Sequence, residues 1–188
     1  MARLNNKQVA DVFAKIGDLL EIKGENRFKI LAYRKAADSI TGLGQDLFDV
    51  WQSGQDLKQI EGIGQAIAEK IDELFSTGEL GFWNRLVAEV PESLVDVLAI
   101  PDVGPKLAKL MWQELNITTV AQVKAAAEQG QLRSLPRMGE KSEARILASI
   151  EALARRQTDR VHLGVAWPLA QRVLAALRAL PQTQKVET

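Results

Sequence analysis

The sequence has 188 residues, no cysteine and a single histidine, His162. Without cysteine the chain can form neither a disulfide scaffold nor a thiolate metal site, and one histidine argues against a zinc enzyme. No apolar run approaches the roughly 20 residues that span a bilayer, and the N-terminus lacks the apolar region of a secretory signal. We therefore expect a cytoplasmic protein with no membrane partner.

The chain also lacks an excess of charge of either sign, since 24 Lys and Arg residues balance 24 Asp and Glu residues. A neutral total argues against a nucleic-acid partner, because nucleic-acid-binding domains are usually basic. The charge is nevertheless uneven, with a net +4 over residues 23–35 and a net −7 over residues 36–80. A solvated helix face explains most single charge runs, but this pattern would confine an anionic partner to particular faces.

Apolar residues recur at helical spacing along most of the chain, which predicts an all-α protein of short helices and short connections. Asn5 and Gly24 bound the first expected helix, Pro105 begins another, and Gly78 and Gly130 follow helix ends. The other expected helices cover residues 27–40, 46–51, 65–75, 82–88, 92–98, 105–115, 120–128, 140–154 and 168–180. The segment 161–165 alone has a strand-like pattern.

Length and turn residues predict two small helical lobes, at residues 1–80 and 81–155, followed by a linker and one helix at residues 156–188. The first lobe should contain a core formed in part by the helix at residues 27–40. Its expected core-facing residues are Phe28, Leu31, Ala32 and Ala36.

A short pattern occurs three times, as IEGIG at residues 60–64, IPDVG at 100–104 and LPRMG at 135–139. The last glycines are 40 and 35 residues apart, a spacing typical of internal repeats, and each precedes an expected helix. This is the form of a helix-hairpin-helix motif. The two apolar residues would hold the turn in the core, while the glycine permits a close backbone approach or a positive φ.

A tight turn that opens a helix directs backbone N–H groups outward at the positive end of the helix dipole, where they can bind a phosphate without lysine. We therefore expect DNA binding through the backbone, largely independent of base sequence. The candidate contacts are Gly62, Gly64, Gln65, Gly104, Lys106, Arg137, Gly139 and Lys141, together with the basic residues Lys29, Arg34 and Lys35.

The turn carbonyls can also hold a monovalent cation, Na⁺ or K⁺, that bridges to a phosphate oxygen. The candidate carbonyls belong to Lys58, Ile60 and Ile63 in the first hairpin and to Leu98, Ile100 and Val103 in the second. Asp102 and Arg137 stand where the first hairpin has a second glycine. Asp102 would weaken phosphate binding, whereas Arg137 would contact a phosphate directly or leave the third hairpin as a structural turn.

The segments AYRKAA (residues 32–37) and IEGIGQAIAEKIDELFSTGEL (residues 60–80) resemble the N-terminal region of family X DNA polymerases, the DNA polymerase β group, and in particular bacterial members. The resemblance covers essentially the whole chain. It implies a lyase-like domain at residues 1–80, a fingers-side hairpin domain at 81–155, and the start of a palm domain in the tail. It also implies an N-terminal fragment of a longer repair polymerase, with Mg²⁺ only in the palm that would follow.

The same resemblance places the nucleophile of a 5′-deoxyribose phosphate lyase on Lys70, with Glu69 and Tyr33 in supporting roles. Such a lysine forms a Schiff base and must be partly deprotonated. The sequence departs from the eukaryotic pattern at Ala66, Phe28 and Glu79, which implies a weaker grip on the 5′-phosphate. The alternative for Lys70 is an ordinary exposed lysine paired with a glutamate one turn away, at position 73.

Two other functions remain open from the sequence. The chain could be a non-catalytic helix-hairpin-helix module that binds double-stranded DNA in another repair or recombination protein. It could also be a helical protein–protein adaptor whose glycine turns are purely structural. If the chain is the N-terminal region of a repair polymerase, as the resemblance implies, we expect a monomer that binds gapped, nicked or primer-template DNA.

Overall fold

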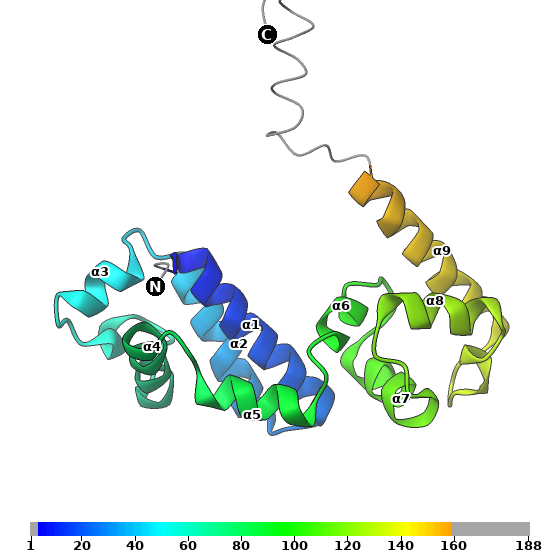
Figure 1. Cartoon of the computed structure of the whole chain (residues 1–188), viewed down its shortest axis with the longest axis horizontal. Helices are drawn as coiled ribbons and strands as arrows, with labels where there is room; N and C mark the ends of the chain where they lie inside the picture. The colour runs from blue at the N-terminus through cyan, green and yellow to red at the C-terminus, as the bar shows by residue number, and fades with distance from the viewer. Residues whose placement is uncertain (1–3, 159–188) are drawn as a thin grey trace, which may run out of the picture. The chain divides into compact units, whose positions relative to one another are not determined.

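The computed structural model describes residues 4–158, and every regular element in this range is a helix (Figure 1). The α-helices are α1 (Asn6–Lys23), α2 (Arg27–Thr41), α3 (Leu47–Gln52), α4 (Gln65–Thr77), α5 (Gly81–Glu89), α6 (Leu94–Leu98), α7 (Pro105–Leu115), α8 (Val120–Glu128) and α9 (Glu140–Thr158). Two short 3₁₀ helices, η1 (Leu57–Gln59) and η2 (Leu132–Ser134), precede α4 and α9. The predicted all-α fold is confirmed, while the expected strand at 161–165 and helix at 168–180 lie outside the described residues.

Local capping interactions determine where several helices begin and end. The Asn5 side chain accepts a hydrogen bond from the backbone N–H of Gln8, whose own side chain bonds back to Asn5, so α1 begins with a capping box. Gly24 ends α1 and Gly78 ends α4, both in the left-handed region with φ of 90° and 79°. Pro105 is the first residue of α7.

The helices α1 and α2 lie side by side and form the main apolar core of the first part of the chain (Figure 1). Phe13 and Ile16 of α1 are fully buried, and α2 contributes Tyr33, Ala36 and Ile40. Burial of this apolar area, at about 25 cal/mol per Å², is the main stabilising term for the pair.

The expected core face of α2 is largely wrong. Phe28 is 81% exposed and Leu31 is 47% exposed, and Ala32 is also at the surface; only Ala36 of the four is buried. The helix has apolar residues on two faces, and the one that continues through Ile30 and Ile40 meets α1 instead. The other face therefore leaves two large apolar side chains exposed.

Contacts of α1 extend beyond α2 to α5, α6 and α7, which joins the two expected lobes. By its internal contacts the chain divides into one compact unit at residues 1–147 and a second at residues 148–188. The domain boundaries expected at residues 80 and 155 stay predictions. Within the described residues, none of the helices has the length and apolar character required to cross a bilayer.

Candidate nucleic-acid interface

The three repeated segments form the same hydrogen-bonded turn. In each, the carbonyl of the first apolar residue accepts a bond from the N–H of the second, at 3.0 Å (Ile60 to Ile63), 3.1 Å (Ile100 to Val103) and 3.0 Å (Leu135 to Met138). Ile63, Ile100, Val103 and Leu135 are buried and hold the turns in the core, whereas Ile60 and Met138 are half-buried. The repeat found in the sequence is therefore a repeat of structure.

The third residue of each turn has a positive φ, at 85° for Gly62, 70° for Asp102 and 65° for Arg137. Glycine adopts this left-handed conformation without cost, aspartate tolerates it, and arginine is strained by roughly 1 kcal/mol. Asp102 and Arg137 thus occupy the conformation of the glycine that they replace. The two altered copies keep the hairpin shape at some cost in stability.

The last glycine of each turn has a different role. Gly64 (φ −87°, ψ 176°) and Gly104 (φ −93°, ψ 173°) have extended backbone that any residue adopts, so the positive-φ explanation does not apply to them. A Cβ atom at Gly64, Gly104 or Gly139 would have no protein atom within 4 Å. No side chain caps α4 or α7 at these positions. The space in front of the first helical turn is open to a ligand that approaches the backbone closely.

The first hairpin packs against α2 at its third residue. A Cβ at Gly62 would lie 2.6 Å from Ser39 Oγ and 2.9 Å from Lys35 Cγ, so both conformation and space favour glycine here. The Lys35 ammonium forms a 3.0 Å ion pair with Glu61 in the same turn. Lys35 is thereby positioned beside the hairpin, with its side chain 60% exposed.

Lys29 of α2 and Lys70 of α4 converge on one aromatic ring. Their Nζ atoms lie 5.3 and 5.2 Å from the centroid of the Phe82 ring, at the start of α5. Tyr33 stacks on Phe82 with centroids 5.7 Å apart, and Lys70 Nζ also donates to the Ala66 carbonyl at 3.1 Å. The structure thus brings together three of the predicted site residues, which we call the Phe82 cluster: Lys29, Tyr33, Lys70 and the ring itself.

Tyr33 is the buried member of the Phe82 cluster, and burial raises the pKa of its phenol to about 12. It also stacks on Phe13, so three rings follow one another from the core to the surface. At neutral pH the phenol is therefore uncharged. It can donate a proton in a hydrogen bond, but it is a poor acceptor of a proton from substrate.

Arg34 and Glu69 are not part of the Phe82 cluster. The Arg34 guanidinium binds Asp18 and Glu21 on α1, at 2.8 Å for the former, and so is directed toward its own protein. Glu69 accepts a 2.8 Å hydrogen bond from Gln65 and lines a separate hollow of about 370 Å³. The carboxylate of Glu73 accepts the backbone N–H of Gly81 at 2.9 Å, and within residues 4–158 no ion pair joins it to Lys70.

The second and third hairpins carry the remaining predicted contacts. Lys106 lies in the first turn of α7 and Lys141 in the first turn of α9, while Arg137 lies in the turn itself. The carboxylate of Asp102, which the sequence marks as unfavourable for phosphate, lies 3.9 Å from the Arg145 guanidinium. That cation offsets part of the negative charge at the second hairpin.

An ion pair between the half-exposed Arg133 and the buried Glu143, which the sequence does not predict, stabilises the third hairpin. Glu143 of α9 is 2% exposed, and one of its carboxylate oxygens accepts bonds from the Arg133 guanidinium at 2.9 and 2.6 Å. The other oxygen accepts the Arg133 backbone N–H at 3.1 Å. Burial alone would raise the pKa of Glu143, but the bonds from Arg133 outweigh it and the pKa is lowered.

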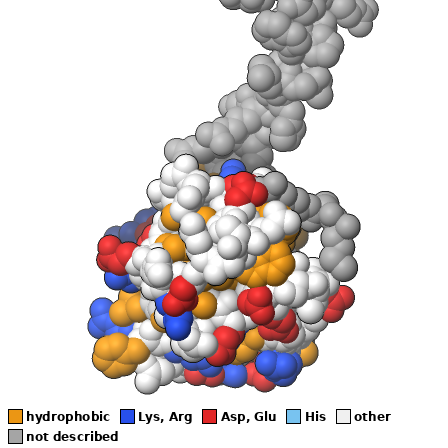
Figure 2. Space-filling view, turned by 90° about the vertical axis from the view of Figure 1, so that its left-hand side faces the viewer, with side chains coloured by type: hydrophobic (Ala, Val, Ile, Leu, Met, Phe, Trp, Pro, Cys, Tyr) orange, Lys and Arg blue, Asp and Glu red, His pale blue; other side chains and the backbone are white. Residues whose placement is uncertain are grey.

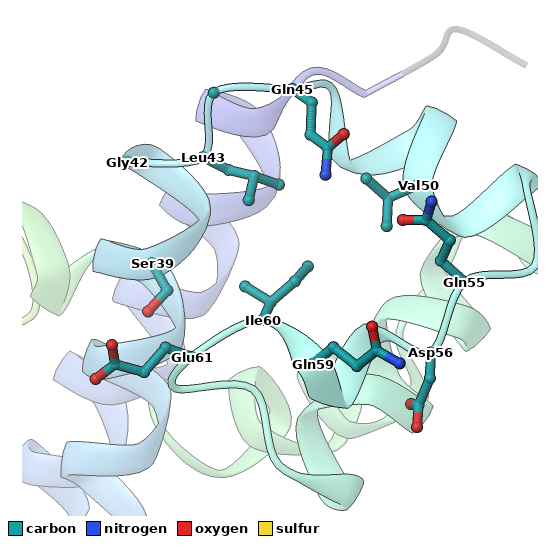
Figure 3. Close-up of a pocket in the computed structure, with 11 residues that line it drawn as sticks. Ser39, Gly42, Leu43, Gln45, Val50, Gln55, Asp56, Gln59, Ile60 and Glu61 are labelled. Carbon is teal, nitrogen blue, oxygen red and sulfur yellow. The ribbon is translucent and has the colours of Figure 1, made fainter.

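A polar groove of about 560 Å³ lies beside the first hairpin, between it and the loop that follows α2 (Figure 3). Ile60 points into it from the hairpin, and Gln45, Gln55 and Gln59 surround the opening (Figure 3). Its lining contains Asp56 and Glu61 but no lysine or arginine. The groove therefore adds no positive charge to the phosphate-binding surface of the hairpin.

The monovalent-cation sites stay a prediction. Ile60 and Ile100 already accept the turn hydrogen bond, and a carbonyl oxygen keeps a second lone pair for a cation. Backbone oxygens suit a hard cation such as Na⁺ or K⁺. Among residues 4–158 there is no group of three or more His, Cys, Asp or Glu side chains arranged to hold a metal ion.

Surface charge is mixed rather than gathered into one patch on the face drawn in Figure 2. There, basic and acidic side chains alternate with apolar ones over the part of the chain that is coloured. A surface of this kind does not attract DNA by a broad positive potential. Specific phosphate sites are the remaining means by which this face could hold nucleic acid.

Comparison with known proteins agrees with this architecture. A helix-hairpin-helix domain model matches residues 4–80, and a SAM-like helix-hairpin-helix tandem model matches residues 94–154. The DNA polymerase/3′-5′ exonuclease PolX of Bacillus subtilis (strain 168) is 30% identical over 170 residues, which is 90% of this chain. The match covers 29% of PolX, so the chain spans less than a third of this relative's length.

Proposed function

We propose that this chain, which has the sequence and the helix-hairpin-helix domains of the N-terminal region of a family X DNA polymerase, binds DNA through its phosphate backbone. The observation that carries the proposal is the turn shared by the three hairpins. Each opens a helix at a glycine with no protein atom in front of it. A single glycine-containing turn between helices is common in proteins, but three turns with the same hydrogen bond and the same positive φ support a shared ligand.

A phosphate at these positions would accept hydrogen bonds from the backbone N–H groups of the first helical turn, where the helix dipole favours an anion. Lys106 and Lys141 follow the second and third glycines within two residues and would add charge-assisted contacts. These groups contact the sugar–phosphate backbone and not the base edges. Binding is therefore expected to be independent of sequence.

We further propose that the substrate is gapped DNA with a 5′-phosphate, bound at the Phe82 cluster. Lys29 and Lys70 present two ammonium groups to one ring, and the Lys29 ammonium also lies 3.4 Å from the Glu25 carboxylate. Two cations beside one ring suit a terminal phosphate, which carries more negative charge than one inside the strand. Arg34 is not part of this site, since it is bound to α1.

A 5′-deoxyribose phosphate lyase reaction at Lys70 is the finer form of the proposal. The neutral amine would attack the C1′ aldehyde of an abasic sugar, and loss of water would give an imine. A base would remove a C2′ proton, and the C3′–O bond would break with the electron pair passing to the phosphorylated DNA strand. Water would then hydrolyse the imine and restore the amine. Tyr33, as an uncharged phenol, would support the site without serving as the base.

DNA binding is tested by titrating the chain with a one-nucleotide gap carrying a 5′-phosphate and with intact duplex, over a range of salt concentrations. We expect tighter binding to the gap, and an affinity that falls as salt rises because bound phosphates release counterions. Equal affinity for both DNAs would favour the non-catalytic module. An absence of binding at low salt would favour the protein–protein adaptor and refute the proposal.

The lyase reaction is tested by borohydride reduction in the presence of DNA with an abasic 5′ end, which traps the imine as a covalent adduct. We expect an adduct with the unmodified chain and its loss in Lys70→Ala. Lys124→Ala is the matched control, because Lys124 is also a helix lysine near an acidic residue, at 3.7 Å from Glu128, but lies on α8. An undiminished adduct with Lys70→Ala would remove Lys70 from the mechanism.

A further inference from the structure

The geometry points to Phe82 as the positioning residue of the Phe82 cluster, an inference that rests on the lyase proposed for Lys70. Its ring is the common neighbour of Lys29 Nζ at 5.3 Å, Lys70 Nζ at 5.2 Å and the Tyr33 ring at 5.7 Å. These three residues come from α2 and α4, whereas Phe82 comes from α5. Phe82 thus contacts side chains from both lysine-bearing helices.

The ring itself is held firmly. Tyr33 stacks on it with an interplanar angle of 12°, and Tyr33 in turn stacks on the fully buried Phe13. The preceding residue, Gly81, donates its backbone N–H to the carboxylate of Glu73 on α4 at 2.9 Å. The first turn of α5 is therefore fastened to α4, three residues beyond Lys70 in sequence. Phe82 is only half-buried, so the lysine amines can reach it from solvent.

A fixed ring limits where two flexible side chains can go. A lysine in water samples many rotamers, and ordering it costs free energy that a cation–π contact offsets in part. Contact with Phe82 holds each amine about 5 Å from the centre of one ring, so that a phosphorylated sugar bound there would meet a cation and a nucleophile. When Lys70 gives up its proton to become the nucleophile, Lys29 remains as the cation over the ring. Phe82 therefore acts by positioning the lysines and takes no part in the bond changes.

The test compares single-turnover borohydride trapping, at saturating abasic DNA with a 5′-phosphate, in the unmodified chain and in Phe82→Leu and Phe82→Tyr. We expect Phe82→Leu to trap about fivefold more slowly, since it keeps apolar bulk but loses the ring, and Phe82→Tyr to stay within about twofold. Trp83→Leu is the matched control. It removes the adjacent aromatic residue, whose ring lies 6.0 Å from Lys15 Nζ, and should leave the trapping rate unchanged.

A second measurement covers the case in which Phe82→Leu does not fold. The lysines of the unmodified chain are reductively dimethylated with ¹³C formaldehyde, which keeps their charge, and their methyl signals are assigned by Lys29→Arg and Lys70→Arg. We expect ring-current shifts for both signals and nuclear Overhauser contacts to the Phe82 ring. Methyl signals at random-coil positions without such contacts would overturn the inference.

The outcomes separate this inference from the function on which it rests. Trapping by the unmodified chain with an equal rate in folded Phe82→Leu would overturn the role of Phe82 and leave the lyase standing. If Phe82→Leu and Phe82→Tyr both trap equally slowly, the role of Phe82 is also overturned, because an aromatic ring at this position would then not be sufficient for the normal rate. No trapping by the unmodified chain would refute the lyase itself and, with it, any positioning role.

Discussion

Two glycines of the first hairpin, Gly62 and Gly64, are only two residues apart, yet alanine should impair a different property at each position: stability at Gly62 and DNA binding at Gly64. Gly62 has a φ of 85° and lies against α2. Gly64 has ordinary extended backbone and faces open space. We predict that Gly62→Ala lowers the free energy of unfolding, whereas Gly64→Ala leaves it almost unchanged and weakens DNA binding.

The magnitudes follow from the geometry. At Gly62 a Cβ costs roughly 1–2 kcal/mol for the left-handed conformation, and its approach to Ser39 Oγ at 2.6 Å adds a clash, for a total of about 2 kcal/mol or more. At Gly64 alanine is the poorer N-cap by about 0.5 kcal/mol, but it restricts the unfolded chain by a similar amount. The free energy of unfolding should therefore change by less than about 0.5 kcal/mol.

The effect of Gly64→Ala on binding arises from the space that its methyl group fills. A phosphate in contact with the first turn of α4 would meet this group, and the loss of one hydrogen bond to a charged oxygen is worth about 1.5–3 kcal/mol. The dissociation constant for gapped DNA should rise about tenfold or more. Gly104→Ala, with the same backbone geometry and the same open space, should behave alike at the second hairpin.

Thermal unfolding and fluorescence titration with labelled DNA separate these effects. Gly62→Ala should lower Tm by about 6 °C, on the scale of a chain of this length, while Gly64→Ala should melt with the unmodified protein. A folded Gly64→Ala that binds DNA as tightly as the unmodified chain would refute a phosphate contact in front of Gly64. A Gly64→Ala as unstable as Gly62→Ala would also refute it, since Gly64 would then be needed for folding and not for binding.

Three further predictions concern the other hairpins. Arg137→Gly should stabilise the protein by about 0.5 to 1 kcal/mol in denaturant unfolding, because it relieves a left-handed arginine; Asp102→Gly should stabilise it less but bind DNA more tightly, because a carboxylate leaves the turn. Glu143→Gln should destabilise the chain by about 2 kcal/mol at neutral pH through loss of charge-assisted bonds from Arg133. The folded pKa of Glu143 lies below its ordinary 4.5, so this difference in stability should persist above pH 4.5 and shrink as pH falls through the folded pKa. Urea unfolding at several pH values measures it. A difference that stays constant with pH would contradict the prediction.

Local signals were sufficient to predict most helix ends and the three hairpins. Capping by Asn5, the left-handed Gly24 and the first-turn Pro105 each depend on residues within one helical turn. The hairpins were equally local, because the turn needs only two apolar residues and a tight backbone. Even Asp102 and Arg137, which depart from the pattern, adopt the conformation that the first copy predicts.

Features that depend on a second element were not predictable in this way. Helix α2 has two apolar faces of similar quality, and only the position of α1 decides that Phe28 is exposed. Arg34 was grouped with its basic neighbours, but its partner Asp18 comes from another helix. Phe82 follows α4 without any motif of its own, so its place between Lys29 and Lys70 appears only once three helices are packed.

The basic run at residues 23–35 shows why a local charge sum overstates attraction to DNA. Lys23 pairs with Glu89 at 2.6 Å, Arg34 with Asp18 and Lys35 with Glu61, all from other elements, while Glu25 within the run pairs with Lys29 at 3.4 Å. Side chains paired in this way neutralise few phosphates, so their contact with DNA displaces few of its counterions. Backbone N–H groups do not have this disadvantage, because they present a partial positive charge that no side chain at Gly64 or Gly104 satisfies. A neutral chain can therefore hold DNA at a few fixed phosphates, provided that the hairpin glycines stay open.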